Sequence, residues 1–298
     1  MKTIPLHFAT ACLFLLSAAS LSALSTHTWV GANGNDANSG TPTSPYADFA
    51  TAVANTAAGG TVSVTGPGDY GPFTITQSIT VDGTGGGSIN FAGDGEGIYV
   101  SAGANANVVL RNLSIDGGGT GSDAIFIASA GTTNTINVVI DGCLIAGFVD
   151  IGVGLGSESP MYVTVKNTSI QGGELGVRTF QNGTAAPITN NDHVQLDHVT
   201  IQGATVNGVF TRNGNLDISN STITGTVGSG AVGIQADTYA TINVQSTMIT
   251  SNTYGVCSYA NSIVIIGTST VVADNGTNVD GCGGSVQGMA GAGPSPRI

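Results

Sequence analysis

Basic residues are scarce in this sequence. Its 298 residues include 6 Lys and Arg against 18 Asp and Glu, which gives a formal net charge of −12. Binding to phosphate groups depends on clusters of Lys and Arg, so this balance excludes nucleic acid and anionic membrane surfaces as partners. Charged residues amount to 8% and aromatic residues to 6%, while Gly occurs 46 times. Such a composition is typical of a polar, strand-forming chain and not of a helical enzyme domain.

Long apolar runs are also missing after the first 25 residues. Within that segment, Lys2 precedes the apolar residues 13–16, and small residues follow up to Ser25, which is typical of a secretory signal. No later segment approaches the roughly 20 apolar residues that a membrane-spanning helix needs. We therefore expect a protein that is secreted, extracellular or periplasmic, and not inserted in a membrane.

A hydrophobic repeat of about ten residues occurs seven times. The segments are 108–117, 138–147, 163–172, 194–203, 215–225, 241–251 and 263–273. Aligned on the aliphatic residue near their end, they recur every 30, 25, 31, 22, 26 and 22 residues; these residues are Ile115, Ile145, Ile170, Ile201, Ile223, Ile249 and Val271. A repeat of this length indicates stacked coils, each burying its apolar face on its neighbours. The sequence therefore predicts one continuous solenoid domain.

Each repeat is predicted to turn a corner between two strands. In the first, Val108, Leu110 and Ile115 alternate inward while Arg111 points outward. The corner positions carry mostly residues that tolerate a left-handed backbone or bond locally: Asn112, Gly142, Asn167, His198, Asn220, Ser246 and Thr268. Stacked Asn side chains in this corner are expected to bond one another along the axis, as in an Asn ladder.

A second signature, Gly or Ala followed by an aliphatic residue, lies between these corners, as in Gly97-Ile98 and Gly176-Val177. It predicts a further strand in each coil. Alternation places two columns of side chains outward on this strand: Tyr99, Phe126, Arg178, Phe210, Gln235 and Cys257, and then Ser101, Ala128, Phe180, Arg212, Asp237 and Tyr259. Since parallel strands lie about 4.8 Å apart, the two columns are expected to share one face.

The repeat, of the form hydrophobic-x-hydrophobic-x-Asn-x-x-Ile-x-Gly, resembles that of right-handed parallel β-helix proteins of the pectin-lyase-like superfamily. Residues 29–64 resemble the N-terminal block of secreted members, in which an Asp-x-Asn-x-Gly stretch precedes an amphipathic helix and the first strand. Here Ser44 is expected to cap the helix, with Pro45 at its first position and an apolar stripe of Phe49, Val53 and Ala57.

The resemblance implies an all-β fold, a right-handed parallel β-helix (a single-stranded solenoid) with a short N-terminal capping α-helix. The expected boundaries are a signal peptide at 1–25, an N-terminal loop and capping helix at 26–60, the β-helix at 61–282, and a flexible C-terminal tail at 283–298.

The sites of enzymes in this superfamily provide a comparison. Polygalacturonase-like members carry an Asn-Thr-Asp, a paired Asp-Asp, a Gly-His-Gly and an Arg-x-Lys, none of which occurs here, so hydrolysis by a carboxylate pair is not expected. Pectate-lyase-like members hold Ca²⁺ on several acidic residues and use Arg or Lys as a base. The predicted face has one acid, Asp237, which is too few for Ca²⁺, so no cofactor is expected.

Two interpretations of the outward face stay open. Arg178, Arg212 and Asp237 fall on consecutive coils beside three rings, those of Phe180, Phe210 and Tyr259. In the functional interpretation, the rings stack on sugar faces and the arginines hold a carboxylate or sulfate, with Arg212 as the candidate catalytic base. In the structural interpretation, Arg212 and Asp237 are a surface ion pair of little consequence and the rings cover an exposed sheet.

Cysteine and histidine positions point to structure and not to metal. Cys257 and Cys282 are one coil length apart and are predicted to form a disulfide between successive coils, while Cys143 falls at an inward position and is predicted to be a buried free thiol. In residues 190–198, alternation sends Asp197 outward and places His198 in the corner, so no metal site is predicted.

Taken together, these patterns favour a secreted, monomeric β-helix protein that contacts extracellular or cell-surface polysaccharide. The expected ligand-binding residues are Arg178, Phe180, Phe210, Asp237 and Tyr259, with Arg212 beside them. One alternative is a polysaccharide lyase that performs β-elimination with Arg212 as its base. Another is a structural protein that serves as a spacer.

Overall fold

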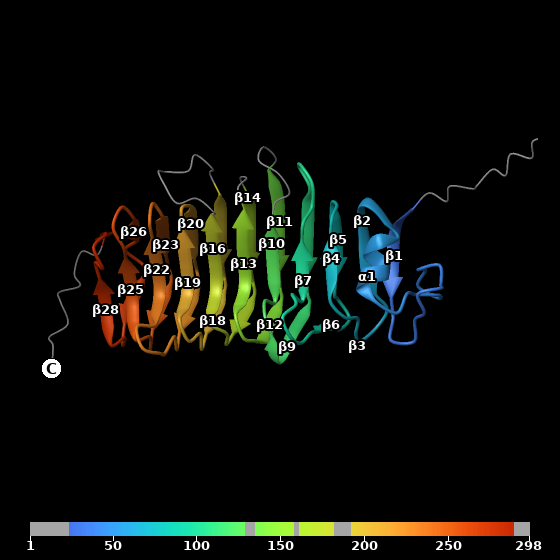
Figure 1. Cartoon of the computed structure of the whole chain (residues 1–298), viewed down its shortest axis with the longest axis horizontal. Coiled ribbons are helices and arrows are strands. Elements are labelled where there is room, and N and C mark those ends of the chain that lie inside the picture. Colours follow the sequence, from blue (N-terminus) through green and yellow to red (C-terminus); the bar gives the residue numbers. More distant parts are fainter. Residues whose placement is uncertain (1–23, 129–134, 158–160, 182–191, 289–298) are drawn as a thin grey trace, which may run out of the picture.

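The chain winds into stacked parallel coils, drawn side by side along the long axis of the molecule in this computed structural model (Figure 1). The structure describes residues 24–128, 135–157, 161–181 and 192–288. The predicted signal peptide therefore lies almost wholly outside the described residues, as do the last ten residues of the predicted C-terminal tail.

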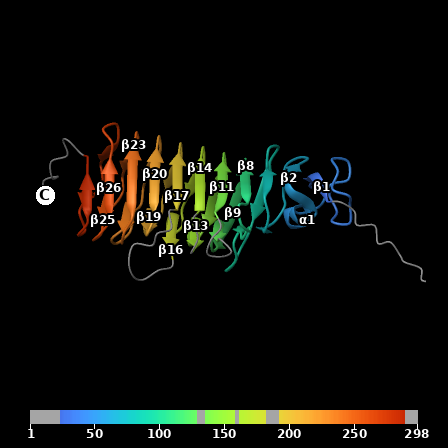
Figure 2. The same ribbon diagram turned by 90° about the horizontal axis from the view of Figure 1, so that it is seen from above.

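Three parallel sheets form the sides of the coils. The eleven-stranded sheet contains β1 (Ser25–Val30), β2 (Thr56–Val64), β5 (Ile79–Asp82), β8 (Asn107–Arg111), β11 (Ile136–Asp141), β14 (Met161–Lys166), β17 (His193–Asp197), β20 (Asn215–Ser219), β23 (Thr241–Gln245), β26 (Ile263–Ile266) and β29 (Ser285–Gln287), most of which are seen from above in Figure 2. The β4–β28 sheet contains β4 (Phe73–Ile75), β7 (Ile98–Val100), β10 (Ile125–Ala128), β13 (Ile151–Ser157), β16 (Leu175–Gln181), β19 (Asn207–Arg212), β22 (Val232–Asp237), β25 (Tyr254–Ser258) and β28 (Thr277–Asp280). The β3–β27 sheet contains β3 (Gly68–Asp69), β6 (Gly87–Asn90), β9 (Ser114–Gly121), β12 (Leu144–Phe148), β15 (Ser169–Gln171), β18 (Thr200–Gln202), β21 (Thr222–Thr224), β24 (Met248–Thr250) and β27 (Val271–Ala273).

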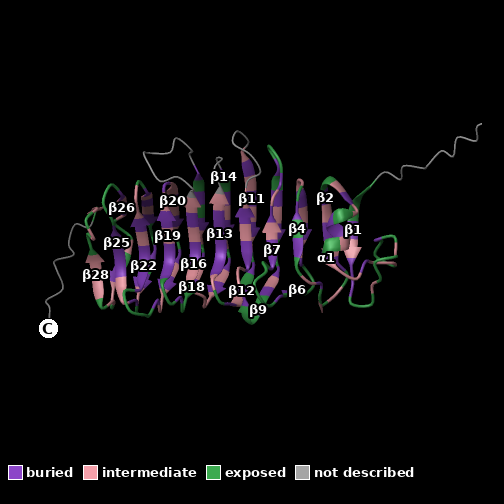
Figure 3. Cartoon of the chain, viewed as in Figure 1, coloured by how far each residue is buried: buried purple, intermediate pink, exposed green. Residues whose placement is uncertain are grey.

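The aliphatic residues of the repeat form one axial column. Successive strands of the β3–β27 sheet pair in register at Ile89, Ile115, Ile145, Ile170, Ile201, Ile223 and Ile249, and each of these side chains is at most 1% exposed. Buried and partly exposed residues alternate along the strands, as Figure 3 shows. This register confirms the predicted all-β solenoid, because only alternation in every coil keeps one side of each strand inside.

The last repeat departs from the predicted alignment by one residue. Val272, and not Val271, pairs with Ile249 and is buried, whereas Val271 pairs with Met248 and is 54% exposed. The seventh repeat has one more residue between its paired core positions, Ile266 and Val272, than the sixth has between Val244 and Ile249. That residue is taken up in a turn in which the Thr270 amide donates to the Gly267 carbonyl. The predicted corner position, Thr268, consequently lies in this longer turn.

A helix closes the N-terminal end, but it is shorter than predicted. Helix α1 spans Phe49–Ala54 and its N-cap is Asp48, whose carboxylate accepts from the Thr51 amide at 2.6 Å. The predicted cap, Ser44, and Pro45 precede it in a loop, because the backbone beyond them is used to pair Tyr46 with Trp29.

Two of the three residues of the predicted apolar stripe belong to this helix. Phe49 and Val53 are buried, and the Phe49 ring packs on Tyr70 and Phe73, whereas Ala57 belongs to β2. The helix therefore covers the first coils with about one and a half helical turns and with one large ring, that of Phe49.

The corners have the predicted left-handed backbone but not the predicted Asn ladder. Positive φ angles occur at Asn112, Gly142, Asn167, His198, Asn220 and Ser246. The Asn side chains donate to aspartates of the preceding coil: Asn112 to Asp82 at 3.3 Å, Asn167 to Asp141 at 2.8 Å, and Asn220 to Asp197 at 2.8 Å. No two successive corners both carry Asn, because Gly142 lies between Asn112 and Asn167 and His198 lies between Asn167 and Asn220, so these amides bond to carboxylates and not to one another.

The same aspartates also hold two of the few basic residues. Asp82, Arg111, Asp141, Lys166 and Asp197 follow one another in register on the outer face of the eleven-stranded sheet. Arg111 lies 2.8 Å from Asp82, and Lys166 lies 3.3 Å from Asp141. Two basic side chains are therefore occupied in linking coils on this sheet.

A true Asn ladder lies inside the corner that follows the β3–β27 sheet. Asn252 is 3% exposed; its Oδ1 accepts from the Thr226 amide at 2.9 Å, and its Nδ2 donates to the Ile223 carbonyl at 3.2 Å and to Asn275 Oδ1 at 2.9 Å. In the next coil, Asn275 Nδ2 donates to the Ile249 carbonyl at 3.0 Å. The buried amide of Asn252 and the partly buried amide of Asn275 satisfy backbone groups that the corner leaves without sheet partners.

The C-terminal coil is tied to its neighbour by a disulfide. Cys257 and Cys282 form the predicted bridge, with their Cα atoms 5.8 Å apart. Cys143 is a buried free thiol, and its burial raises the pKa to about 11. Strand pairing continues to Gln287 through β29, which pairs with β26. Regular structure therefore extends into the segment expected to be a tail, because Val286 packs against the core.

We expect Asn252→Ala to lower the free energy of unfolding by about 2–4 kcal/mol, because the Thr226 amide and the Ile223 carbonyl would remain buried without partners. The matched control is Asn243→Ala on the outer face of β23, which loses one partly buried bond to Asp217, leaves no backbone group without a partner and should cost less than about 1 kcal/mol. Urea unfolding monitored by circular dichroism measures both. Equal losses would show that the internal ladder is not a special source of stability.

Candidate functional site

The predicted patch residues gather on the outer face of three neighbouring strands, β16, β19 and β22. In register, Arg178 lies opposite Phe210, and Phe210 opposite Gln235; Phe180 lies opposite Arg212, and Arg212 opposite Asp237. The alternate residues of these strands, among them Val177, Thr179, Val209 and Thr211, are buried. The sequence alternation therefore places both arginines and both phenylalanines on one side of the sheet, and we call these residues, with Asp237 and Tyr259, the arginine patch.

Phe180 is the centre of the arginine patch. The guanidinium carbon of Arg178 lies 5.4 Å from the centroid of the Phe180 ring, and that of Arg212 also lies 5.4 Å from it. Both distances are within the range of cation–π attraction. One ring thus holds two positive groups near each other, which mutual repulsion would otherwise drive apart.

Arg212 is partly neutralised by Asp237. Its Nε lies 3.6 Å from Asp237 Oδ2, and the two side chains are 36% and 24% exposed. Asp237 Oδ1 also accepts from the Thr238 amide at 2.8 Å and from the Thr238 hydroxyl at 3.1 Å. The carboxylate is therefore fixed in position by three contacts and leaves the outer edge of the guanidinium open.

Arg178 has no acidic partner of this kind in the residues that the structure describes. Arg111, Lys166 and Arg212 each have an aspartate within 4.0 Å, but Arg178 has none. Its Nε is buried and makes no hydrogen bond to the described part of the chain. Its positive charge is therefore available to a ligand.

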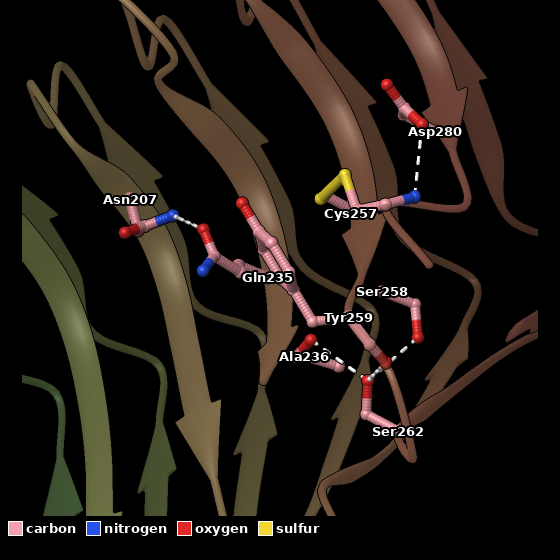
Figure 4. The surroundings of a disulfide bond; sticks show 9 residues. Asn207, Gln235, Ala236, Cys257, Ser258, Tyr259, Ser262 and Asp280 are labelled. Atoms are coloured by element: carbon pink, nitrogen blue, oxygen red, sulfur yellow. Dashed lines mark hydrogen bonds between the residues drawn. A yellow bond between two sulfur atoms is a disulfide. The ribbon is translucent and has the colours of Figure 1, made fainter. Parts of the chain in front are cut away.

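Tyr259 and Gln235 border the patch on the C-terminal side (Figure 4). Tyr259 follows β25, is 42% exposed, and points back along the axis towards Gln235. Gln235 Oε1 accepts from Asn207 Nδ2 at 2.7 Å. The Cys257 disulfide lies beside them in the next position of the column, so this border is rigidly held.

A row of acidic residues lies at the other edge of the same face, where each coil enters the β4–β28 sheet. Glu96, Asp123, Asp150 and Glu174 precede β7, β10, β13 and β16 in consecutive coils. Backbone bonds stack these entries, since the Gly97 amide donates to the Asp123 carbonyl and the Glu174 amide to the Asp150 carbonyl. We call these four residues the acidic row.

The acidic row was not predicted from the sequence, because only positions inside the strands were assigned a direction. A signal was nevertheless present: an acidic residue stands one or two positions before the Gly or Ala of the signature in four successive coils.

Asp123 is the most perturbed member of the acidic row. Burial raises its pKa to about 6, with a further contribution from the neighbouring negative charge of Asp150 and a smaller one from Glu96. The Ile151 amide, which donates to Asp123 Oδ1 at 3.2 Å, and the positive charge of Arg178 act in the opposite direction. The acidic row and Arg178 therefore influence each other electrostatically.

The histidines predicted to be structural have structural contacts. His198 adopts a positive φ in the corner, and its Nδ1 lies 3.0 Å from Asp197. His193 stacks on Tyr162, with ring centroids 6.0 Å apart. Across the described ranges, no three His, Cys, Asp or Glu side chains converge in an arrangement suited to a metal ion. In the same part of the chain, no helix has the length and apolarity needed to cross a membrane.

Solved structures with the same architecture are similar to this chain. A pectate lyase, Pel9A, superposes with a TM-score of 0.59 at 14% identity, covering 88% of this chain and 77% of the other. A lacto-N-biosidase of family GH136 from Eubacterium ramulus superposes with a TM-score of 0.54 at 9% identity, covering 88% and 67%. No protein-family model and no curated protein matches the sequence. At these identities the similarity concerns the fold alone, which it confirms as a right-handed parallel β-helix of the pectin-lyase-like type.

We expect Asp123→Asn to stabilise the protein at pH 7–8 and to have little effect near pH 4. Because the folded-state pKa of Asp123 is raised to about 6, its contribution to stability is present at low pH and is lost as pH rises through 6. The gain at pH 8 should be about 1–2 kcal/mol, below the roughly 3 kcal/mol of a full two-unit shift because Asp123 is partly exposed. Thermal unfolding from pH 4 to 8 measures it.

Asp197→Asn provides a comparison of opposite sign. Hydrogen bonds from Asn220, Ser219 and His198 lower the pKa of Asp197 to about 2, so its contribution is present at neutral pH and is lost on acidification. This variant should be destabilised at pH 7 and less so near pH 2. A pH-independent effect of Asp123→Asn would contradict the assignment of the acidic row.

Proposed function

We propose that this protein binds an acid-bearing polysaccharide through the arginine patch and does not cleave it. The observation that carries the proposal is the pair of guanidinium groups of Arg178 and Arg212, each 5.4 Å from the Phe180 ring, with Arg178 lacking an acidic partner in the described chain. Arginine forks bind carboxylate and sulfate groups by paired hydrogen bonds. A partly exposed aromatic ring beside them suits the apolar face of a sugar.

The net charge of −12 opposes a polyanion at long range. At physiological ionic strength the Debye length is about 8 Å, so distant acidic side chains are screened while direct contacts at the patch are not. A carboxylate that touches Arg178 and Arg212 is therefore attracted locally, and regions of the polymer beyond the patch are not. This favours recognition of individual acidic units within a polymer.

Binding fits the patch better than β-elimination with Arg212 as base. A general base has to accept a proton, whereas an arginine side chain forms an ion pair with a carboxylate, as Arg212 does with Asp237 at 3.6 Å. Arg212 is therefore assigned to ligand binding. Lyase activity is an alternative that the retention experiment below can also detect through its products.

The solved structures of the same fold supply a weaker argument. Both are named for carbohydrate substrates, pectate and lacto-N-biose units, and this chain shares their scaffold. Secretion, which the first 25 residues predict, would place the protein where such polymers occur. We propose that it acts there as a monomer.

We expect the protein to be retained by polygalacturonate and alginate in affinity electrophoresis, and Arg178→Ala to weaken retention by about 10-fold or more. That loss corresponds to one charge-assisted contact of about 1.5–3 kcal/mol. Arg111→Ala is the matched control, since Arg111 is an exposed arginine on the eleven-stranded sheet, paired with Asp82. Its retention should equal that of the wild type.

The same samples distinguish the alternatives. Release of unsaturated products that absorb ultraviolet light would establish a lyase and overturn the assignment to binding alone. Equal retention of Arg178→Ala and Arg111→Ala would remove the arginine patch from recognition. No retention and no product with any acidic polymer would favour the spacer protein.

We further expect Asp237→Asn to tighten binding to the acidic polymers by about 3-fold or more, because it removes the negative charge that competes for Arg212. Asn retains an oxygen that can accept from the Thr238 amide, so the local backbone should remain in place. Unchanged or weaker retention would indicate that Asp237 itself contacts the ligand.

A further inference from the structure

Two aromatic rings lie next to the arginine patch on the same sheet. Tyr99 on β7 and Phe126 on β10 are in register, with ring planes within 9° of parallel and centroids 6.2 Å apart. Nearly parallel rings at this centroid distance lie within the range of aromatic pairs in proteins. Both are partly exposed. We call the pair the aromatic shelf.

The Phe126 ring rests on a strand whose outward positions carry no side chains. Gly154 and Gly156 of β13 lie opposite Phe126 and Ala128. A Cβ atom on Gly154 would be 2.8 Å from Phe126 Cδ2, and one on Gly156 would be 2.8 Å from Phe126 Cζ. The ring therefore occupies the space above both glycines and lies along the backbone of β13. Only glycine at these two positions permits this placement.

The aromatic shelf is continuous with the arginine patch. Gly154 lies opposite Arg178, and Gly156 opposite Phe180. Phe126 itself is on β10, two coils before Arg178 on β16, but its ring lies over β13, the strand next to β16. Coils are separated by about 4.8 Å, a step similar to the length of one sugar unit. A polymer lying along the axis would place adjacent sugars on the shelf and at the patch.

The charges beside the shelf differ in sign from those at the patch. Asp123 lies two residues before β10, which carries Phe126, and Asp150 lies one residue before β13, over which the Phe126 ring lies. A ligand carboxylate at the shelf would contact these acidic groups and an apolar ring. It would lose its hydrating water there without gaining a contact with a positively charged side chain. A neutral sugar would pack its C–H face on the ring and offer hydroxyl donors to the aspartates.

We infer that the ligand is a heteroglycan in which an acidic sugar, held at Arg178 and Arg212, is followed along the axis by a neutral pyranose that stacks on Phe126 and Tyr99. This inference rests on the proposed function and adds to it the composition and direction of the polymer. Specificity arises from both an attractive and a repulsive element. The arginines bind the acidic sugar, and the acidic row repels a second acidic sugar at the neighbouring position on the shelf.

The test compares two probes by isothermal titration. One is short gellan fragments, in which single glucuronates are separated by neutral sugars, and the other is oligogalacturonate, in which every unit is acidic. The wild type should prefer the gellan fragments. Phe126→Ala and Tyr99→Ala should each weaken gellan binding by about 3-fold to 10-fold and change oligogalacturonate binding by less than about 2-fold.

Tyr162→Ala is the matched control, because Tyr162 forms a similar parallel pair with His193 on the eleven-stranded sheet. It should bind both probes as the wild type does, and thermal unfolding checks that all variants are folded. If Phe126→Ala binds gellan as well as the control does while Arg178→Ala does not, the inference is wrong and the proposed function stands. If Phe126→Ala weakens both probes equally, the ring supports the patch and does not select a neutral sugar, which also overturns the inference. If the wild type binds neither probe, the inference and the proposed function are both rejected.

Discussion

The in-register pairing of one coil with the next is the interaction on which this structure depends. Backbone hydrogen bonds between parallel strands fix the axial step at about 4.8 Å, and side-chain alternation then decides which residues enter the core. The column that runs from Ile89 to Ile249 shows that the register holds over seven coils. The same register aligns the outward side chains, so Arg178, Phe210 and Gln235 meet although they are far apart in sequence. The register between coils therefore determines both the core and the surface patch.

The basic residues that the structure describes are divided between two sheets and have different surroundings on each. On the eleven-stranded sheet, Arg111 and Lys166 are each placed one coil after an aspartate, and these pairs join neighbouring coils. On the β4–β28 sheet, two arginines share the Phe180 ring, and in the described part of the chain Arg212 has an aspartate within 4.0 Å whereas Arg178 does not. Exposed ion pairs of the first kind add little stability, and a cation without a carboxylate partner adds none. The second arrangement is the one on which the proposed binding of an acidic polymer depends.

Much of the architecture could be predicted from the sequence, because the repeat is regular at the positions that form the core. The aliphatic anchors, the left-handed corners, the outward columns and the disulfide all follow from spacing. The deviations occur where spacing alone is insufficient. One extra residue in the final turn moved the core position from Val271 to Val272, and a carboxylate at Asp48 set the start of the helix.

The site was predicted less completely, for related reasons. The members of the arginine patch lie inside strands, except Tyr259, which directly follows β25, and alternation gives each of these side chains a direction. The acidic row precedes the strands, and no periodic rule orients a residue there. Gly154 and Gly156 were overlooked because they contribute no side chain, yet they allow Phe126 to lie beside Arg178. A position without a side chain can shape a surface as strongly as one that has a ring.

The disulfide has a consequence for how the solenoid loses order. In a repeat protein each coil is stabilised only by its neighbours, so the last coil, which has one neighbour, would be the first to peel away. Linking Cys257 to Cys282 closes a loop with a sequence separation of 25 and joins the final winding to the one before it. Fraying from this end then has to release two windings together, a much costlier event than releasing one. In an oxidising compartment the bridge would hold the last two windings together. The border of the site formed by Tyr259 and Gln235 would then be as rigid as an interior coil.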